Sequence, residues 1–166
     1  MDTVLDLIAS FAATGEAAGL RLGMPGGEAD ALLGGGTGLD RPPRSPAQRM
    51  TGFKDGSLEV WVGADGTIGL LGFDRAGTDA GFLAPTRAGG AAGRQHGDAV
   101  TYGVITGRLA ARGCAWRPDE ALTFDDQLAI RTEAEVSLTF TRPGSGSDGR
   151  GRLLANLYTS WSAPAG

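Results

Sequence analysis

The chain has 166 residues, of which 41% are hydrophobic and 20% are charged, and its formal net charge is −4. This length fits one ordinary domain, and the composition is that of a globular protein rather than a disordered or membrane-spanning one. An acidic surface repels phosphate backbones, so we expect no nucleic-acid partner, whereas a basic protein partner is permitted.

The cysteine content and the first residues of the chain help to predict its cellular compartment. Cys114 is the single cysteine, so no internal disulfide can form. The start of the chain lacks the basic and then apolar pattern of a signal peptide, and no apolar run approaches the roughly 20 residues of a membrane helix. We therefore expect a cytoplasmic protein with no membrane partner.

Two helices are expected near the start of the chain. Apolar residues recur at helical spacing from Val4 to Ala12, and Gly15 can end that helix. A shorter helix can open at Pro25, whose missing N–H would be unpaired there anyway, and end before Gly34.

The next stretch predicts a loop, a hairpin and a long connection. Residues 34–50 combine prolines, glycines and arginines without an apolar period, so we expect a loop. The strand-like runs 57–62 and 67–73 flank an Asp-Gly pair, which is a strong hairpin signal. Residues 75–97 are poor in apolar side chains, and we expect them to form a flexible crossover.

The second half predicts a helix followed by strands. Asp98 or Thr101 can cap a helix that stops at Gly113. Apolar and polar side chains alternate along residues 127–141, which predicts a hairpin with one buried face and an exposed turn near residues 132–135. A last strand is expected from Arg152 to Trp161.

These elements predict a single α+β domain over residues 1–166. We expect an antiparallel sheet of about five strands, with two or three helices on one face. The order helix, helix, strand, strand and then helix, strand, strand, strand indicates a weak two-fold internal repeat.

The chain lacks the residues that several kinds of binding site require. The glycine-rich residues 34–38 follow a helix instead of preceding one, unlike a phosphate-binding loop. One histidine and one cysteine cannot supply a zinc site, and the acids between Asp119 and Asp126 do not have the spacing of a calcium loop. We therefore expect no metal and no cofactor.

Two patterns of residues could point to an enzyme, but each has a simpler explanation. Cys114 or a serine could act with His96, although a loop histidine and a small apolar cysteine explain both residues. Glu59 could perform glycoside hydrolysis with Asp125 or Asp126, although Glu59 is equally a solvent-side strand residue. Neither pattern is specific, so we expect no enzyme.

Two stretches resemble a known group of proteins. LRLGMPGGEADALLG followed by FKDGSLEVWVGADGTIGLLGFD is similar to the repeat of small actinobacterial immunity proteins, which are encoded beside secreted polymorphic toxins. ITGRLAARGCAWRPDE and QLAIRTEAEVSLTF resemble their second half. The resemblance implies a helix-plus-sheet repeat like that of β-lactamase-inhibitor-like and outer-membrane-assembly-lipoprotein-like domains, and a role in neutralising a toxin.

We therefore expect a non-enzymatic protein-binding protein, an immunity protein whose toxin has a basic active-site surface. Aromatic anchors rimmed by charges are typical of protein interfaces, although the same aromatics could close the ends of the core. The candidate partner-binding residues are Glu59, Trp61, Asp65, Trp116, Asp119, Glu120, Asp125 and Asp126. The alternative is a small-ligand-binding domain or hydrolase with a pocket between the sheet and the loops, in which Glu59 and His96 would matter most.

Overall fold

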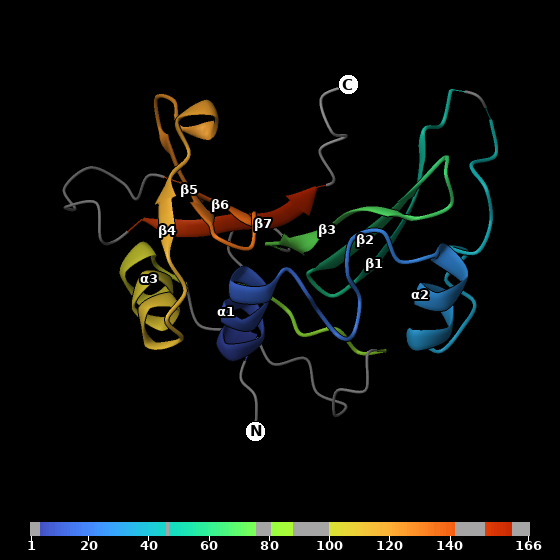
Figure 1. Cartoon of the computed structure of the whole chain (residues 1–166), viewed down its shortest axis with the longest axis horizontal. Helices are drawn as coiled ribbons and strands as arrows, with labels where there is room; N and C mark the ends of the chain where they lie inside the picture. The colour runs from blue at the N-terminus through green and yellow to red at the C-terminus, as the bar shows by residue number, and fades with distance from the viewer. Residues whose placement is uncertain (1–3, 46, 76–80, 88–99, 142–151, 161–166) are drawn as a thin grey trace.

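The computed structural model describes residues 4–45, 47–75, 81–87, 100–141 and 152–160. Seven strands form one antiparallel sheet in the order β1-β2-β3-β7-β6-β5-β4, and the three α-helices lie on one of its faces (Figure 1). In chain order the elements are α1 (Val4–Thr14), α2 (Gly26–Leu32), β1 (Met50–Asp55), β2 (Leu58–Gly63), β3 (Ile68–Asp74), α3 (Tyr102–Ala111), β4 (Trp116–Pro118), the 3-10 helix η1 (Glu120–Leu122), β5 (Gln127–Thr132), β6 (Ser137–Thr141) and β7 (Leu153–Ser160).

The predicted α+β class is confirmed, but the sheet has two strands more than expected. Both extra strands, β1 and β4, are edge strands. Met50, which the sequence placed in a loop, begins β1, and this strand carries Gly52, Lys54 and Asp55 rather than an apolar run. β4 has only three residues and includes Pro118. An edge strand pairs on one side only, so it needs little of the strand-forming pattern that identifies a central strand.

Each half of the chain runs from a helix into a set of consecutive antiparallel strands, in agreement with the expected repeat. The first half ends in β3 and the second half ends in β7. These two strands pair with each other at the middle of the sheet, and the edges are β1 and β4.

The helix ends follow the expected local chemistry. Gly15 ends α1 with a φ of 73°, and its N–H donates to the Phe11 carbonyl at 2.7 Å. The hydroxyl oxygen of Thr101 accepts a hydrogen bond from the Val104 N–H at 3.3 Å and so caps α3. The other proposed cap, Asp98, lies outside the described residues. Within the described residues, no helix is long and apolar enough to cross a membrane.

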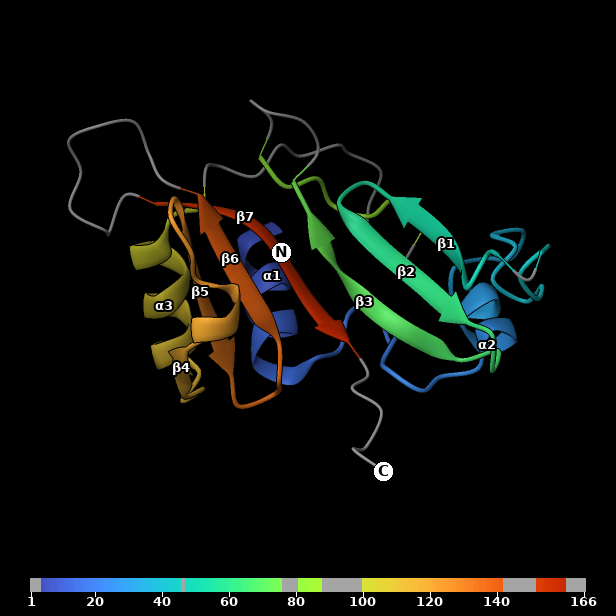
Figure 2. The same cartoon turned by 90° about the horizontal axis from the view of Figure 1, so that it is seen from above.

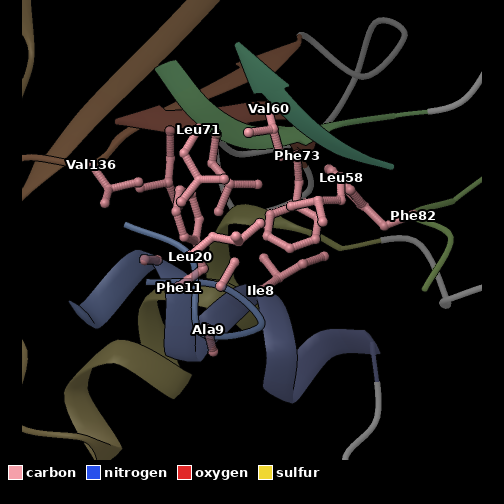
Figure 3. Packing of buried hydrophobic residues seen from close by; sticks show 14 of the residues in the cluster. Ile8, Ala9, Phe11, Leu20, Leu58, Val60, Leu71, Phe73, Phe82 and Val136 are labelled. Atoms are coloured by element: carbon pink, nitrogen blue, oxygen red, sulfur yellow. The ribbon is translucent and has the colours of Figure 1, made fainter. Parts of the chain in front are cut away.

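The core fills the space between the helices and the sheet (Figure 3). Phe11 of α1 meets Phe73 of β3 edge to face, with ring centroids 5.3 Å apart. Val136, Leu138 and Phe140 at alternate positions of the central hairpin are fully buried, as their spacing predicts. Each such side chain contributes roughly 1.5–3 kcal/mol when it leaves water.

The described part of the crossover packs against the turn between β1 and β2. Phe82 is 1% exposed and belongs to the core. The Leu83 N–H donates to Ser57 Oγ at 2.9 Å, and the Asp55 carboxylate accepts from Thr86 Oγ1 at 2.8 Å and from the Arg87 N–H at 2.7 Å. The remaining crossover residues, 76–80 and 88–97, lie outside the described residues.

Candidate functional site

A row of residues crosses the face of the sheet opposite the α-helices. Directly opposed residues of an antiparallel sheet project from the same face, and here the register links one residue from every strand. From β1 to β4 the row is Lys54, Glu59, Gly72, Tyr158, Ser137, Arg131 and Arg117. We call this side of the sheet the open face. Figure 2 looks onto it, and among the described helical elements only η1 lies on that side (Figures 1 and 2).

Glu59 is the most enclosed charge of the row and is only 6% exposed. Leu58 and Val60, its neighbours on β2, point into the core and fix its side chain on the open face. Its Oε2 accepts hydrogen bonds from Tyr158 Oη at 3.0 Å and from Trp61 Nε1 at 3.4 Å. Lys54 forms an ion pair with Oε1. Every polar atom of the Glu59 carboxylate is therefore engaged.

Two glycines make room for the aromatic rings beside Glu59. A Cβ atom on Gly72 of β3 would clash with the Tyr158 ring and with the Leu157 carbonyl. A Cβ atom on Gly52 of β1 would lie only 2.6 Å from Cε3 of Trp61. Both rings thus pack closely against the backbone of a neighbouring strand at a glycine, which permits such an approach.

The charged groups at this end of the open face shift one another's pKa values. Burial, and next the charge of Glu59, raise the pKa of Asp74, which lies two residues past Gly72 on the same face. The pKa of Lys54 is raised mainly by its hydrogen bond to Glu59. Burial, with the charges of Asp74 and Glu59, also raises the pKa of Tyr158. Glu59 and Asp74 therefore repel each other here, while Lys54 and Arg75 attract Asp74.

A second charged cluster occupies the other end of the open face. Asp119 is 6% exposed, and its Oδ2 accepts from Arg131 Nε at 2.9 Å and from Ser137 Oγ at 3.3 Å. Glu135 contacts both Arg131 and Arg117 at 3.4 Å. The acids and arginines of this cluster are paired with one another, so it presents both positive and negative groups.

The connection from β4 to β5, which begins at Asp119, carries an exposed aromatic residue. Phe124 is 58% exposed, the largest exposed fraction among the described large hydrophobic residues. Backbone bonds of 3.1 Å and 2.7 Å pair it with Gln127, and Gln127 Nε2 donates to the Leu122 carbonyl at 2.7 Å. Thr123 Oγ1 donates to the Asp119 carbonyl at 2.8 Å. The ring is thus presented by a loop that its own hydrogen bonds hold in place.

The structure brings together only part of the predicted binding set. Glu59, Trp61 and Asp119 share the open face, and the exposed acids Glu120, Asp125 and Asp126 belong to the same β4–β5 connection as Phe124. Trp116 points to the helix side instead, where its ring meets Tyr102 of α3 at 5.9 Å. Asp65 accepts hydrogen bonds from the Thr67 N–H and hydroxyl and shapes the turn between β2 and β3. Successive strand residues alternate faces, which is why Trp116 and Arg117 diverge.

Sequence reasoning missed several residues of the open face. The alternating pattern of β7 identified a strand but did not place Tyr158 opposite Gly72, because strand order cannot be deduced from local spacing. Asp74 and Lys54 have no local sequence signal that links them to Glu59. An isolated Phe followed by two acids was the one signal that could have drawn attention to Phe124.

The enzymatic constellations weighed from the sequence do not assemble among the described residues. Cys114 is buried, which raises the pKa of its thiol, and His96 lies outside the described residues. Glu59 and the pair Asp125 and Asp126 belong to opposite ends of the sheet, with β3, β7 and β6 between them. In the part of the chain that the structure describes, no group of three or more His, Cys, Asp or Glu side chains could hold a metal ion.

A pocket of about 380 Å³ lies between the edge strand β1 and the loop before it. It is lined by Thr37, Gly38, Arg41, Pro42, Arg44, Gln48, Thr51 and Gly52. The nearby glycine-rich residues 34–38 have a structural role, because the hydroxyl and N–H of Thr37 both donate to Asp30 and hold the pKa of that carboxyl below its usual range.

Comparison with family models, curated proteins and solved structures gives no match.

Proposed function

We propose that the protein is a non-enzymatic binding protein that recognises a basic partner protein through the open face of its sheet. The observation that carries this proposal is the row of fixed side chains from Lys54 to Arg117 on the side that no described α-helix covers. A sheet face that no described α-helix covers, with paired charges, two aromatic rings beside Glu59 and an exposed Phe124, has the parts of a protein interface.

Charge complementarity favours a partner with a basic surface. The chain carries a net charge of −4, and the Glu59 end of the open face holds Asp74 with a pKa raised by burial and by Glu59. A lysine or arginine from a partner would relieve this repulsion and could stack on the Tyr158 or Trp61 ring. Electrostatic attraction of this kind raises the rate of association and depends on ionic strength.

The narrower part of the proposal is that the partner is a bacterial toxin and that this chain is its immunity protein, acting in the cytoplasm. It is supported by the resemblance of residues 20–34 and 53–74 to immunity-protein repeats, and by an acidic surface suited to covering a basic active site. The single, buried Cys114 suits a compartment in which thiols stay reduced.

Two tryptophans on opposite faces provide a matched test. Binding of the toxin-like product of the adjacent gene would be measured by calorimetry with the wild type, with Trp61→Ala and with Trp116→Ala. If the open face is the interface, Trp61→Ala weakens binding by about tenfold or more, and Trp116→Ala changes it less than about twofold. Equal effects of both variants, or a larger effect of Trp116→Ala, would place the interface elsewhere. Absence of any binding by the wild type would remove the immunity assignment.

A further inference from the structure

The pocket beside β1 combines two guanidinium groups with no carboxylate among its lining residues. Arg41 and Arg44 have no ion pair within the described part of the chain, unlike Arg108, Arg117 and Arg131, which contact acids. Asp40, the neighbour of Arg41, is exposed and does not line the pocket. The two charged residues that line this pocket are therefore both positive, in a protein of net charge −4, and Asp30, which accepts hydrogen bonds from the lining residue Thr37, is an acid beside it.

The loop that carries the two arginines contacts the core and β1. Leu39 is 1% exposed and anchors the loop in the core. Thr51 Oγ1 of β1 donates to the Arg41 carbonyl at 3.5 Å, and the Arg44 N–H donates to Gln48 Oε1 at 3.2 Å. These contacts place the backbone of both arginines beside one cavity, which their side chains line.

We propose that this pocket binds a small phosphorylated molecule, with Arg41 and Arg44 on its phosphate oxygens. A guanidinium presents N–H groups in a planar fork that matches an oxyanion, and two of them balance the two charges of a phosphate group. The volume of about 380 Å³ falls at the lower end of the range of small-molecule sites. The pocket adjoins the open face at Gly52, whose backbone lies against the Trp61 ring, and its occupancy is tested in the absence of a protein partner.

Titration of the full chain with inorganic pyrophosphate, at constant ionic strength, tests the proposal by NMR. We expect saturable shifts with a Kd on the order of 1 mM, and a loss of affinity of about tenfold in each of Arg41→Gln and Arg44→Gln. Arg49→Gln is the matched control, because Arg49 is exposed on the same segment but does not line the pocket, and it should retain the wild-type Kd within about twofold.

Three results would overturn the proposal. Shifts that grow linearly without saturation would show only non-specific attraction. An equal loss in Arg49→Gln would show that the segment acts through its overall charge. Tighter binding of succinate than of pyrophosphate would make the pocket a carboxylate site. All three arginines are exposed, so unchanged melting temperatures should show that the variants remain folded.

Discussion

The hydroxyl of Tyr158 on β7 donates a hydrogen bond to the carboxylate of Glu59 on β2 at 3.0 Å, across the intervening strand β3. Gly72 is the β3 residue between them, and its missing side chain leaves the space that the tyrosine ring crosses. This contact ties the last strand of the chain to the first half of the sheet. The same three residues therefore contribute both to stability and to the shape of the open face.

Glu59→Ala should lower the free energy of unfolding by about 2 kcal/mol, because Tyr158 and Trp61 lose their acceptor in a largely enclosed site. The loss stays moderate because the Lys54 side chain is 59% exposed and its charge remains solvated. Urea unfolding at neutral pH measures it. Glu135→Gln, at a 60% exposed ion pair, should change stability by less than about 0.5 kcal/mol. Equal effects of the two substitutions would refute the structural role of Glu59.

Gly72→Ala should destabilise the protein by about 3 kcal/mol or more, because the new methyl group would meet both the Tyr158 ring and the Leu157 backbone. Gly107→Ala is the control. Gly107 lies in α3 with open space around it, so alanine should stabilise the helix by up to about 1 kcal/mol. Opposite shifts in melting temperature are expected, and a tolerated Gly72→Ala would contradict the packing of Tyr158 over β3.

Lowering the pH should release Thr86 and Arg87, which donate hydrogen bonds to the Asp55 carboxylate. Burial alone would raise the pKa of Asp55, but hydrogen bonds from Arg87 and Thr86 outweigh it and hold the pKa below its usual value. A lowered pKa stabilises the folded state above the unfolded pKa of about 3.9, and this contribution disappears as pH falls through the lower folded value. Asp55→Asn should therefore be less stable than wild type near neutral pH, and its stability should fall less steeply between about pH 5 and pH 3.

Urea unfolding across that range, with hydrogen exchange of the Leu83 and Arg87 amides, checks the prediction for Asp55. Glu28→Gln, at an exposed position of α2, is the control and should follow the wild-type pH dependence. If the free energy of unfolding falls equally with pH in Asp55→Asn and in the wild type, Asp55 does not contribute to the loss of stability in acid.

Ionised Asp74 should affect the stability of the fold in the opposite direction to ionised Asp55. Burial and the charge of Glu59 raise its pKa, so its ionised form opposes folding once the pH exceeds its unfolded pKa. We expect Asp74→Asn to gain a few tenths of a kcal/mol near neutral pH and to weaken binding of a basic partner. Paired urea unfolding and calorimetric titration measure the two effects. A variant that loses stability, or that binds the partner more tightly, would argue against an acidic docking site here.

Phe124 should be an interface anchor under the proposed function. Phe124→Ala removes an exposed ring from a loop that is already ordered, so it should weaken partner binding by about tenfold to a hundredfold with little change in stability. Leu32→Ala is the matched control, since Leu32 is 47% exposed on α2, on the opposite side of the sheet. Equal affinity of both variants would exclude the β4–β5 connection from the interface.

Local spacing and turn chemistry were enough to determine the helices and the central strands. The positive φ of Gly15 and Gly113, the Thr101 cap and the alternation along residues 127–141 each act within a few residues, so the sequence displays them directly. The antiparallel α+β class followed from the order of those elements alone. The exposure of Glu133 and Glu135 in the turn followed from their position between two paired strands.

Tertiary structure alone decided which of these residues meet. The pairing of β3 with β7 joins segments more than eighty positions apart, and a shift of one residue in any strand would turn its side chains to the other face. That register places Tyr158 against Glu59, sends Trp116 toward α3 and makes an edge strand of residues 50–55. Long-range strand order is set by how the apolar faces share one core, and no local pattern in a single sequence encodes that arrangement.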